Sequence, residues 1–246
     1  MAMVLEERIG ALDRFRTPLY TVNEAARYLS VPPRTLADWA RGDHRRTPAR
    51  PDVVGEPVLR ALSKAPGRGP TIPFIGLAEG LVLAAVRRSG VPLQRIRPAL
   101  ARLGEQVGLQ HALASHRLYT DGAELLYDYA ETGQGTDAAR AAMDLVVVRN
   151  GRHVFNDVVE SYLRRLDFGE DGYARLIRLP AYEVAEILVD PTRGFGQPIF
   201  ARGGARLEDA MAMFRGGEPL EIVADEYGVP VDQLEDAVRT AVRTTA

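Results

Sequence analysis

Six arginines gather between residues 27 and 50, where only Asp38 and Asp43 oppose them. A cluster of guanidinium groups of this kind can bind the phosphates of a nucleic acid. An ordinary solvated surface is the alternative. The basic residues of the cluster are Arg27, Arg34, Arg41, Arg45, Arg46 and Arg50.

Residues for bond-making chemistry are much harder to find. The absence of cysteine excludes a thiol nucleophile, a Cys-ligated metal and a disulfide framework. The four histidines have neither H-E-x-x-H spacing nor a pair four residues apart. No nucleophile elbow, phosphate loop or dinucleotide-binding glycine pattern occurs. We predict a non-enzymatic protein with no catalytic residue, no metal and no cofactor. A nuclease with a metal site built from carboxylates remains an alternative.

Two short helices are expected to position the arginines. Thr21 and Glu24 have the spacing of a capping box, which predicts a helix start. The prolines of Ser30-Val31-Pro32-Pro33 cannot continue that helix. A second helix is expected from Arg34 to Arg41, ending at Gly42. The buried face of the first helix would consist of Val22, Ala25, Ala26 and Leu29.

Two helices joined by a tight turn make a helix-turn-helix unit, whose second helix can enter a major groove. A helical hairpin that merely packs is the alternative, but the cap, the turn prolines, the closing glycine and the arginines together favour DNA binding. The side chains expected to face DNA are Arg34, Thr35, Asp38 and Arg41, followed by Arg45, Arg46 and Arg50.

Charge is distributed unevenly along the 246 residues, whose total is −2. Residues 1–70 carry +4, residues 71–150 are neutral and residues 151–246 carry −6. A basic head and an acidic tail suggest two different partners. No apolar run reaches membrane-spanning length, and the N-terminus has acids before any apolar stretch, unlike a secretory signal. We expect a cytoplasmic protein that does not bind membranes.

The rest of the chain predicts both helices and β-structure. Leu5, Ile9 and Leu12 are expected to share a helical face, and residues 64–73 to form a wing tip or linker. Helices are expected at 74–89 and 91–103. Asp121-Gly122 and Asn150-Gly151 are typical of hairpin turns, and Asn156 of a helix cap. Further expectations are strands at 173–179 and 182–189 and helices at 207–215, 219–227 and 231–243, the last two with helix-turn-helix spacing.

The N-terminal pattern resembles MerR and excisionase-type winged helices. The resemblance rests on Thr21 through Leu29, Val31-Pro32, Thr35-Leu36, Trp39 and Gly42. It implies that the second helix reads the major groove and that a following wing touches the DNA backbone. By this resemblance Pro33, Arg34, Thr35 and Asp38 face the bases, with Arg45 and Arg46 near the wing.

The C-terminal pattern resembles a domain-of-unknown-function family that accompanies bacterial toxin–antitoxin modules. It consists of Asp190-Pro191, then Gly196-Gln197-Pro198-Ile199-Phe200, then the turn Gly203-Gly204-Ala205-Arg206 and helices. Together with the winged-helix pattern and the stretch from Leu113 to Gly122, it makes the chain similar to a long VapB-type antitoxin. This implies a VapC-type PIN-domain ribonuclease as partner, with Arg193, Arg202 and Arg206 as candidate toxin-binding residues.

We therefore expect an α+β, mainly helical fold in three parts. These are a MerR-like winged-helix DNA-binding domain (1–108), a small α+β domain of hairpin and helix (109–180) and a helical, helix-turn-helix-like domain (181–246). The predicted function is an antitoxin that neutralises its toxin and binds operator DNA to repress its own operon. A homodimer is expected, because one short helix contacts too little DNA alone. A stand-alone transcription regulator that senses a small ligand remains an alternative.

Overall fold

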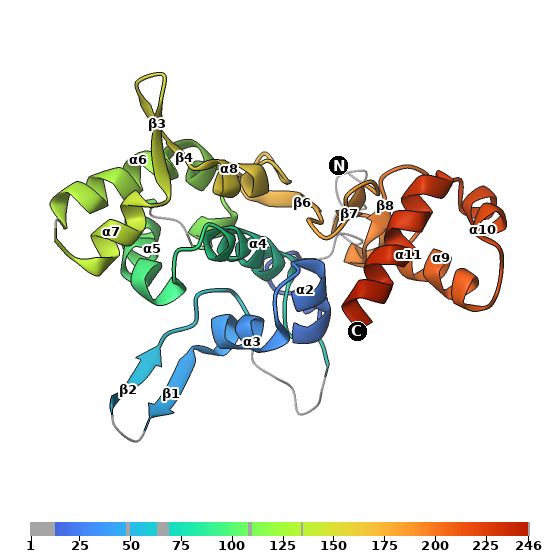
Figure 1. Cartoon of the computed structure of the whole chain (residues 1–246), viewed down its shortest axis with the longest axis horizontal. Helices are drawn as coiled ribbons and strands as arrows, with labels where there is room; N and C mark the ends of the chain where they lie inside the picture. The colour runs from blue at the N-terminus through green and yellow to red at the C-terminus, as the bar shows by residue number, and fades with distance from the viewer. Residues whose placement is uncertain (1–12, 48–49, 63–68, 108–109, 134, 246) are drawn as a thin grey trace, which may run out of the picture.

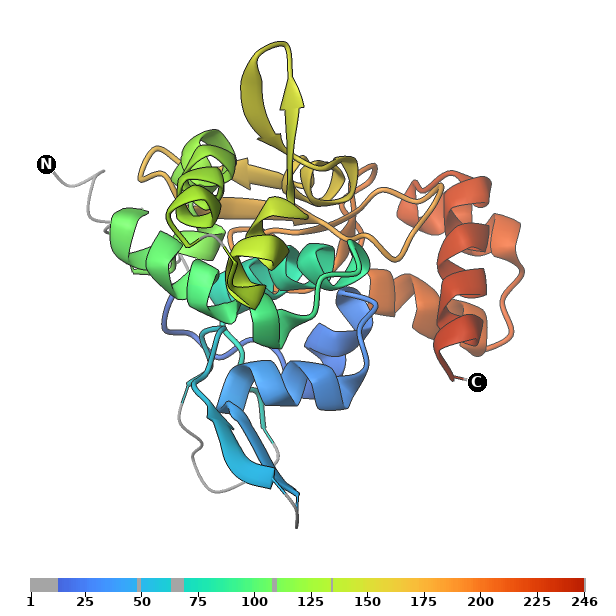
Figure 2. The same cartoon turned by 60° about the vertical axis from the view of Figure 1, so that its left-hand side comes forward.

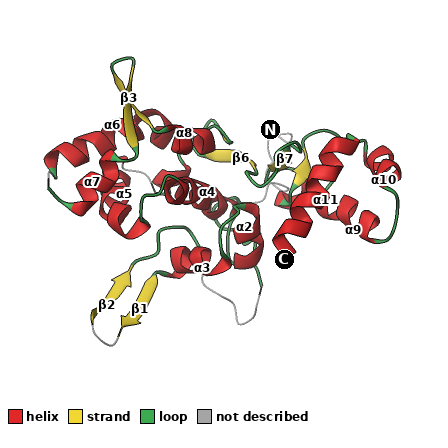
Figure 3. Cartoon of the chain, viewed as in Figure 1, coloured by secondary structure: helices red, strands yellow, loops and turns green. Residues whose placement is uncertain are grey.

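The computed structural model describes residues 13–47, 50–62, 69–107, 110–133 and 135–245. Its architecture is α+β and mainly helical, as the sequence predicts (Figures 1 and 3). Leu5, Ile9 and Leu12, for which a helical face is expected, lie outside the described residues. The same holds for residues 63–68 of the expected wing tip or linker.

The N-terminal unit begins with helices α2 (Val22–Tyr28) and α3 (Pro33–Arg41). Strands β1 (Asp43–Thr47) and β2 (Arg50–Gly55) follow at once and pair as an antiparallel hairpin. This hairpin projects from the body of the molecule beside α3 (Figure 1). The hairpin therefore comes directly after α3, before the proline- and glycine-rich residues 64–73 where a wing tip or linker is expected.

Helix α4 (Phe74–Arg88) is the central element of the fold, and residues Phe74 to Val86 are all buried. The added Cβ of an alanine at Gly80 would lie 2.7 Å from Leu29 Cδ1, so the glycine lets the helix-turn-helix unit pack closely on α4. Helix α5 (Leu93–Val107) follows α4. Both helices lie where the apolar periodicity predicts them.

The middle of the chain differs from expectation at Asp121-Gly122. These residues lie inside helix α6 (His116–Thr132), so the predicted hairpin turn is wrong. Gly122 is buried there, and an added Cβ would lie 3.0 Å from Phe155 Cζ. The glycine therefore serves close packing between a helix and a strand, a role that the Asp-Gly pair does not reveal. A 3-10 turn, η1 (Ala112–Ala114), precedes α6, and helix α7 (Asp137–Met143) follows it.

The second predicted hairpin is confirmed. Strands β3 (Val146–Arg149) and β4 (Arg152–Phe155) pair antiparallel around Asn150 and Gly151, whose φ angles are 52° and 75°. This hairpin projects on the side of the molecule opposite the β1–β2 hairpin (Figures 1 and 2).

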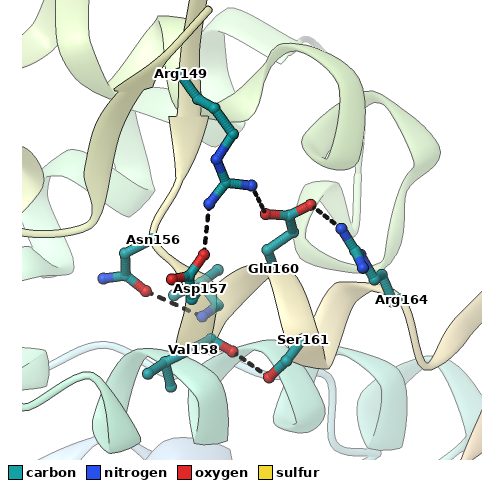
Figure 4. Close-up of polar contacts among 8 residues, drawn as sticks. Arg149, Asn156, Asp157, Val158, Glu160, Ser161 and Arg164 are labelled. Carbon is teal, nitrogen blue, oxygen red and sulfur yellow. Dashed lines mark hydrogen bonds and ion pairs between the residues drawn. The ribbon is translucent and has the colours of Figure 1, made fainter.

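Helix α8 (Asp157–Leu163) follows the hairpin, and Asn156 caps it as predicted. Arg149 ties the hairpin to α8 through ion pairs with Asp157 and Glu160 (Figure 4). The hydrogen bond from Arg164 to Glu160 is the main cause of the low pKa of Glu160.

A four-stranded antiparallel sheet connects the middle of the chain to the tail. Its strands are β5 (Leu166–Phe168), β6 (Ala174–Arg178), β7 (Ile187–Val189) and β8 (Ile199–Phe200), in the order β5-β6-β7-β8. Strands β6 and β7 lie within the segments where strands are expected. The division of the chain at residues 108 and 180 stays a prediction, and this sheet takes strands from both sides of residue 180.

The tail ends in helices α9 (Leu207–Arg215), α10 (Leu220–Tyr227) and α11 (Val231–Thr245), close to the predicted bounds. They gather at one end of the molecule (Figure 1). Asp236 of α11 anchors them, because its Oδ2 accepts hydrogen bonds from the backbone N–H groups of Glu183, Val184 and Ala185 at 2.8–2.9 Å. Within the part of the chain that the structure describes, no helix is long and apolar enough to cross a membrane.

Candidate nucleic-acid interface

Helix α2 starts with the predicted capping box. The Glu24 N–H donates to Thr21 Oγ1 at 3.2 Å, and the Thr21 N–H donates to Glu24 Oε2 at 2.8 Å. Two backbone donors of the first turn are thereby satisfied reciprocally. The start of the helix-turn-helix unit is thus set by local sequence.

The reversal between α2 and α3 occurs at Ser30, one residue before Val31 and the prolines. Its φ is 53°, in the left-handed region that glycine usually occupies. The Val31 N–H donates to Ala26 O at 3.0 Å and the Ser30 N–H donates to Arg27 O at 3.2 Å, the Schellman arrangement of a helix end. Pro32 and Pro33 then start α3.

Helix α3 has one buried and one outward face. Leu36, Trp39 and Ala40 are buried against the rest of the unit. Among the predicted DNA-facing residues, Pro33, Arg34 and Arg41 are exposed, and Thr35 and Asp38 are half-buried. Arg34 lies four residues before Asp38 and Arg41 three after it, yet within the described helix no ion pair joins Asp38 to either arginine. Both guanidinium groups are therefore available to an external anion.

A hollow of about 380 Å³ lies between the start of α2 and the length of α3 from Pro33 to Arg41. Both arginines line it and none of the carboxylates that the structure describes does, so it offers positive charge and hydrogen-bond donors to a phosphate. Sequence reasoning missed two polar residues of this hollow, Asn23 and Thr71. Thr71 had no usable signal, because it lies 50 residues after Thr21 in sequence and reaches the hollow only through the fold. The side chains that carry the chemistry here are Thr21, Asn23, Arg34, Arg41 and Thr71.

The remaining predicted residues lie on the β1–β2 hairpin. Arg45 and Arg46 belong to β1 and Arg50 begins β2, but their side chains lie outside what the structure describes. The chain that leaves the hairpin is held firmly, since Trp39 O accepts the N–H groups of Val58 and Leu59 at 2.9 and 3.3 Å. The hairpin backbone is thereby attached to the end of α3.

Buried Glu79 of α4 supports the chain that follows the β1–β2 hairpin. Its Oε2 accepts the backbone N–H of Arg60 at 2.5 Å, and its Oε1 lies 2.9 Å from His111 Nδ1. Glu79 is 5% exposed, so the carboxylate is compensated by these two partners. An acid in an otherwise apolar helical run was the available sequence signal for this support.

The tail contains a second turn of the same construction. Gly228 has a φ of 62°, the Val229 N–H donates to Ala224 O at 2.9 Å, and Pro230 follows before α11. The charges differ, however, because residues 219–243 contain six acidic and two basic residues. Asp232 and Glu235 are exposed on α11, and their carboxylates would repel phosphates. The N-terminal unit is thus the one suited to DNA.

The three arginines predicted to bind a toxin are all exposed, but they do not form one group. Arg193 and Arg206 lie close to the turn η2 (Gly194–Gly196): an added Cβ at Gly194 would be 3.8 Å from Arg206 Cγ, and one at Gly204 would be 3.3 Å from Arg193 Nη2. Arg206 also lies 3.7 Å from Asp209. Arg202 instead lines a separate hollow of about 420 Å³ beside the turn between α10 and α11.

Candidate metal ligands do not cluster in the described part of the chain, where no three His, Asp or Glu side chains gather as a metal site would require.

Tyr20, directly before α2, connects the N-terminal unit to the tail. Its buried hydroxyl donates to Gly196 O at 2.6 Å. Burial raises the pKa of Tyr20 well above its ordinary value, so the hydroxyl keeps the proton that it donates.

Comparisons with known proteins agree with this geometry. A family profile described as "Putative DNA-binding HTH domain" matches residues 18–100. A protein of Mycobacterium tuberculosis (strain ATCC 25618 / H37Rv) described as "Putative antitoxin VapB45" is 48% identical over 226 residues, covering 92% of this chain and 94% of that protein. The uncharacterized protein Rv2308 of the same strain is 30% identical over 234 residues, covering 92% of this chain and 90% of its own length.

A solved structure extends the agreement to the fold. The crystal structure of Rv2018 from Mycobacterium tuberculosis matches with a TM-score of 0.81 at 45% identity, over 92% of this chain and 99% of that chain. Since both the relatives and the solved structure match nearly the whole length, the likeness is not confined to the DNA-binding unit. The chain therefore belongs to the family of helix-turn-helix proteins that includes the antitoxin-like protein VapB45.

Proposed function

We propose that this protein is a cytoplasmic antitoxin that neutralises a VapC-type PIN-domain ribonuclease and represses its own operon. It acts by binding and carries out no bond chemistry. The observation that carries the proposal is the outward pair Arg34 and Arg41 on the second helix of a helix-turn-helix unit, in a chain 48% identical to a protein described as an antitoxin.

At the operator, the N-terminal unit works as a MerR-like winged helix. Helix α3 enters the major groove with Pro33, Arg34, Thr35 and Asp38 toward the bases. Arg41 contacts phosphate, and the β1–β2 hairpin brings Arg45, Arg46 and Arg50 to the DNA backbone as its wing. Because α3 has only nine residues, a homodimer with two heads is needed for tight binding.

At the toxin, the tail supplies the contact surface. Arg193, Arg202 and Arg206 are exposed and carry positive charge on an otherwise acidic tail. A PIN-domain ribonuclease has a metal-binding acidic cleft, so these arginines offer complementary charge. Arg193 and Arg206 lie close to one turn and are the stronger pair for this role.

The DNA half of the proposal is tested with a duplex that carries the sequence directly upstream of the protein's own reading frame. Fluorescence anisotropy at several salt concentrations gives the number of phosphate contacts from the slope of log K against log salt. We expect the double variant Arg45→Ala/Arg46→Ala to flatten the slope by about one for each phosphate that the variant no longer binds. Arg215→Ala on α9 is the matched control. An unchanged slope would remove the hairpin from the interface.

The toxin half is tested by co-expression with the protein encoded by the adjoining reading frame. We expect a stable complex and loss of that protein's ribonuclease activity. A chain that binds its operator but not this protein would be a stand-alone regulator. Magnesium-dependent cleavage of nucleic acid by the chain alone would instead reveal a nuclease.

A further inference from the structure

We propose that Phe195 is the apolar anchor that this chain inserts into its protein partner, in an apolar pocket edged by carboxylates. This proposal rests on the proposed function, because the partner is the same PIN-domain protein. It adds a contact residue that the arginine pattern does not identify, and it specifies the chemistry of the contact surface.

Phe195 combines two features that are unfavourable in the free chain. Its side chain is 79% exposed, although a phenylalanine normally gains from burial. Its backbone lies in the left-handed region, with φ 56° and ψ 31°, which is strained for a residue with a Cβ. Folding therefore gains nothing from this placement, and strained positions of this kind concentrate at functional sites.

The turn that carries Phe195 is held rigidly at both ends. Asp190 Oδ1 accepts hydrogen bonds from the N–H and the hydroxyl of Thr192 at 2.8 and 2.7 Å. Gly194 is so close to Ile199 that an added Cβ would lie 2.7 Å from Ile199 Cγ2. On the other side, Gly196 accepts the Tyr20 hydrogen bond and lies against Leu19. A ring presented on such a preorganised turn loses little conformational freedom on binding.

Charge around the turn indicates the chemistry of the partner. The exposed Arg193 and Arg206 lie beside the turn that carries the ring. Arg206 pairs loosely with Asp209 at 3.7 Å, and among the described residues no carboxylate pairs with Arg193. An apolar ring on a turn beside two arginines fits an apolar pocket with carboxylates at its rim. The rim carboxylates would lie close to these two arginines, whereas a nucleic acid would spread its phosphates over the surrounding tail, where residues 151–246 carry a net charge of −6.

The test compares the full-length chain with its Phe195→Gly variant, because glycine adopts the left-handed conformation without strain. Binding is measured by calorimetric titration with the PIN-domain protein of the adjoining reading frame. We expect Phe195→Gly to lose about thirtyfold or more in affinity with no fall in Tm, and we expect Arg193→Glu to lose affinity as well. Ile222→Ala, which removes a 52% exposed apolar side chain from α10, is the control and keeps wild-type affinity.

The outcomes separate the anchor from the proposed function. If the wild-type chain binds and Phe195→Gly binds equally well, Phe195 is no anchor and the antitoxin function stands. If the wild-type chain does not bind, both fail. If Phe195→Gly has a lower Tm than the wild-type chain, Phe195 has a structural role instead of a binding role. Loss of operator binding or of self-association with unchanged toxin affinity would assign the ring to DNA or to a second copy, and would overturn the proposal.

Discussion

At the scale of single residues, two buried carboxylates connect parts of the chain that are far apart in sequence. Asp236 is 1% exposed and receives three backbone N–H groups from residues more than fifty positions away. Glu79 likewise links α4 to Arg60 and His111. Neither acid touches the candidate DNA interface, so both are expected to affect stability before function.

Replacement of Asp236 by asparagine is expected to lower the free energy of unfolding of the tail by about 2–3 kcal/mol, because three donors lose a charged acceptor. Hydrogen exchange of the α11 amides measures this loss. Glu235→Gln, at an exposed position on the same helix, should leave exchange unchanged. Equal protection in both variants would mean that apolar packing alone holds the tail.

The same carboxylate predicts a pH dependence. Burial by itself raises the pKa of Asp236, but the hydrogen bonds from Ala185, Val184 and Glu183 outweigh it, so the pKa lies below its usual value. Its contribution to stability is then complete above the unfolded pKa of about 3.9 and is lost as the pH falls through the folded pKa.

The stability gap between wild type and Asp236→Asn should therefore be constant at neutral pH and narrow in acid. Urea unfolding at a series of pH values measures the gap. A gap that widens as the pH falls would contradict the assignment of the low pKa to this carboxylate.

At the scale of elements, local signals in the sequence predict most helices correctly. The Thr21 capping box, the Asn156 cap and the Asn150-Gly151 turn all appear as expected, because each acts through atoms only a few residues apart. The hairpin turn predicted at Asp121-Gly122 is wrong because Gly122 serves the close contact with Phe155, a residue 33 positions later. Long-range contacts of this kind leave no local pattern.

The candidate site follows the same division. Arg34 and Arg41 could be identified from helical spacing, since they share the outward face of one short helix. Thr71 and Phe195 could not be identified in this way. The fold alone brings Thr71 to the hollow, and Phe195 stands out only through its strained backbone. An aromatic residue between two glycines was the only trace of Phe195 in the sequence.

The two similar turns provide a reciprocal test of backbone strain. Ser30 and Gly228 occupy the same left-handed position, and nothing lies within 4 Å of an added Cβ at Gly228. Ser30→Gly should raise the free energy of unfolding by about 0.5–1 kcal/mol, because the left-handed cost to serine exceeds the flexibility that glycine adds to the unfolded chain. Gly228→Ser should lower it by a similar amount. Thermal unfolding of both variants checks this, and changes of the same sign would refute it.

At the scale of the whole molecule, the hydrogen bond from Tyr20 to Gly196 joins the DNA-binding end to the tail across 176 positions. Tyr20→Phe should lower the free energy of unfolding by about 1–2 kcal/mol, because the Gly196 carbonyl loses its buried donor. Urea unfolding measures the loss. Tyr119→Phe, at a 41% exposed ring, is the control. Equal stability of both variants would mean that water replaces the lost donor.

This hydrogen bond also makes the resistance of the N-terminal unit to proteolysis in a cell depend on the tail. A protease that removed the last quarter of the chain would leave the Tyr20 hydroxyl without its acceptor and Leu19 without its contact at Gly196. The remaining fragment would then be less stable and more easily digested further. A single cut in the tail would thus weaken the N-terminal helix-turn-helix unit without any cleavage near α3.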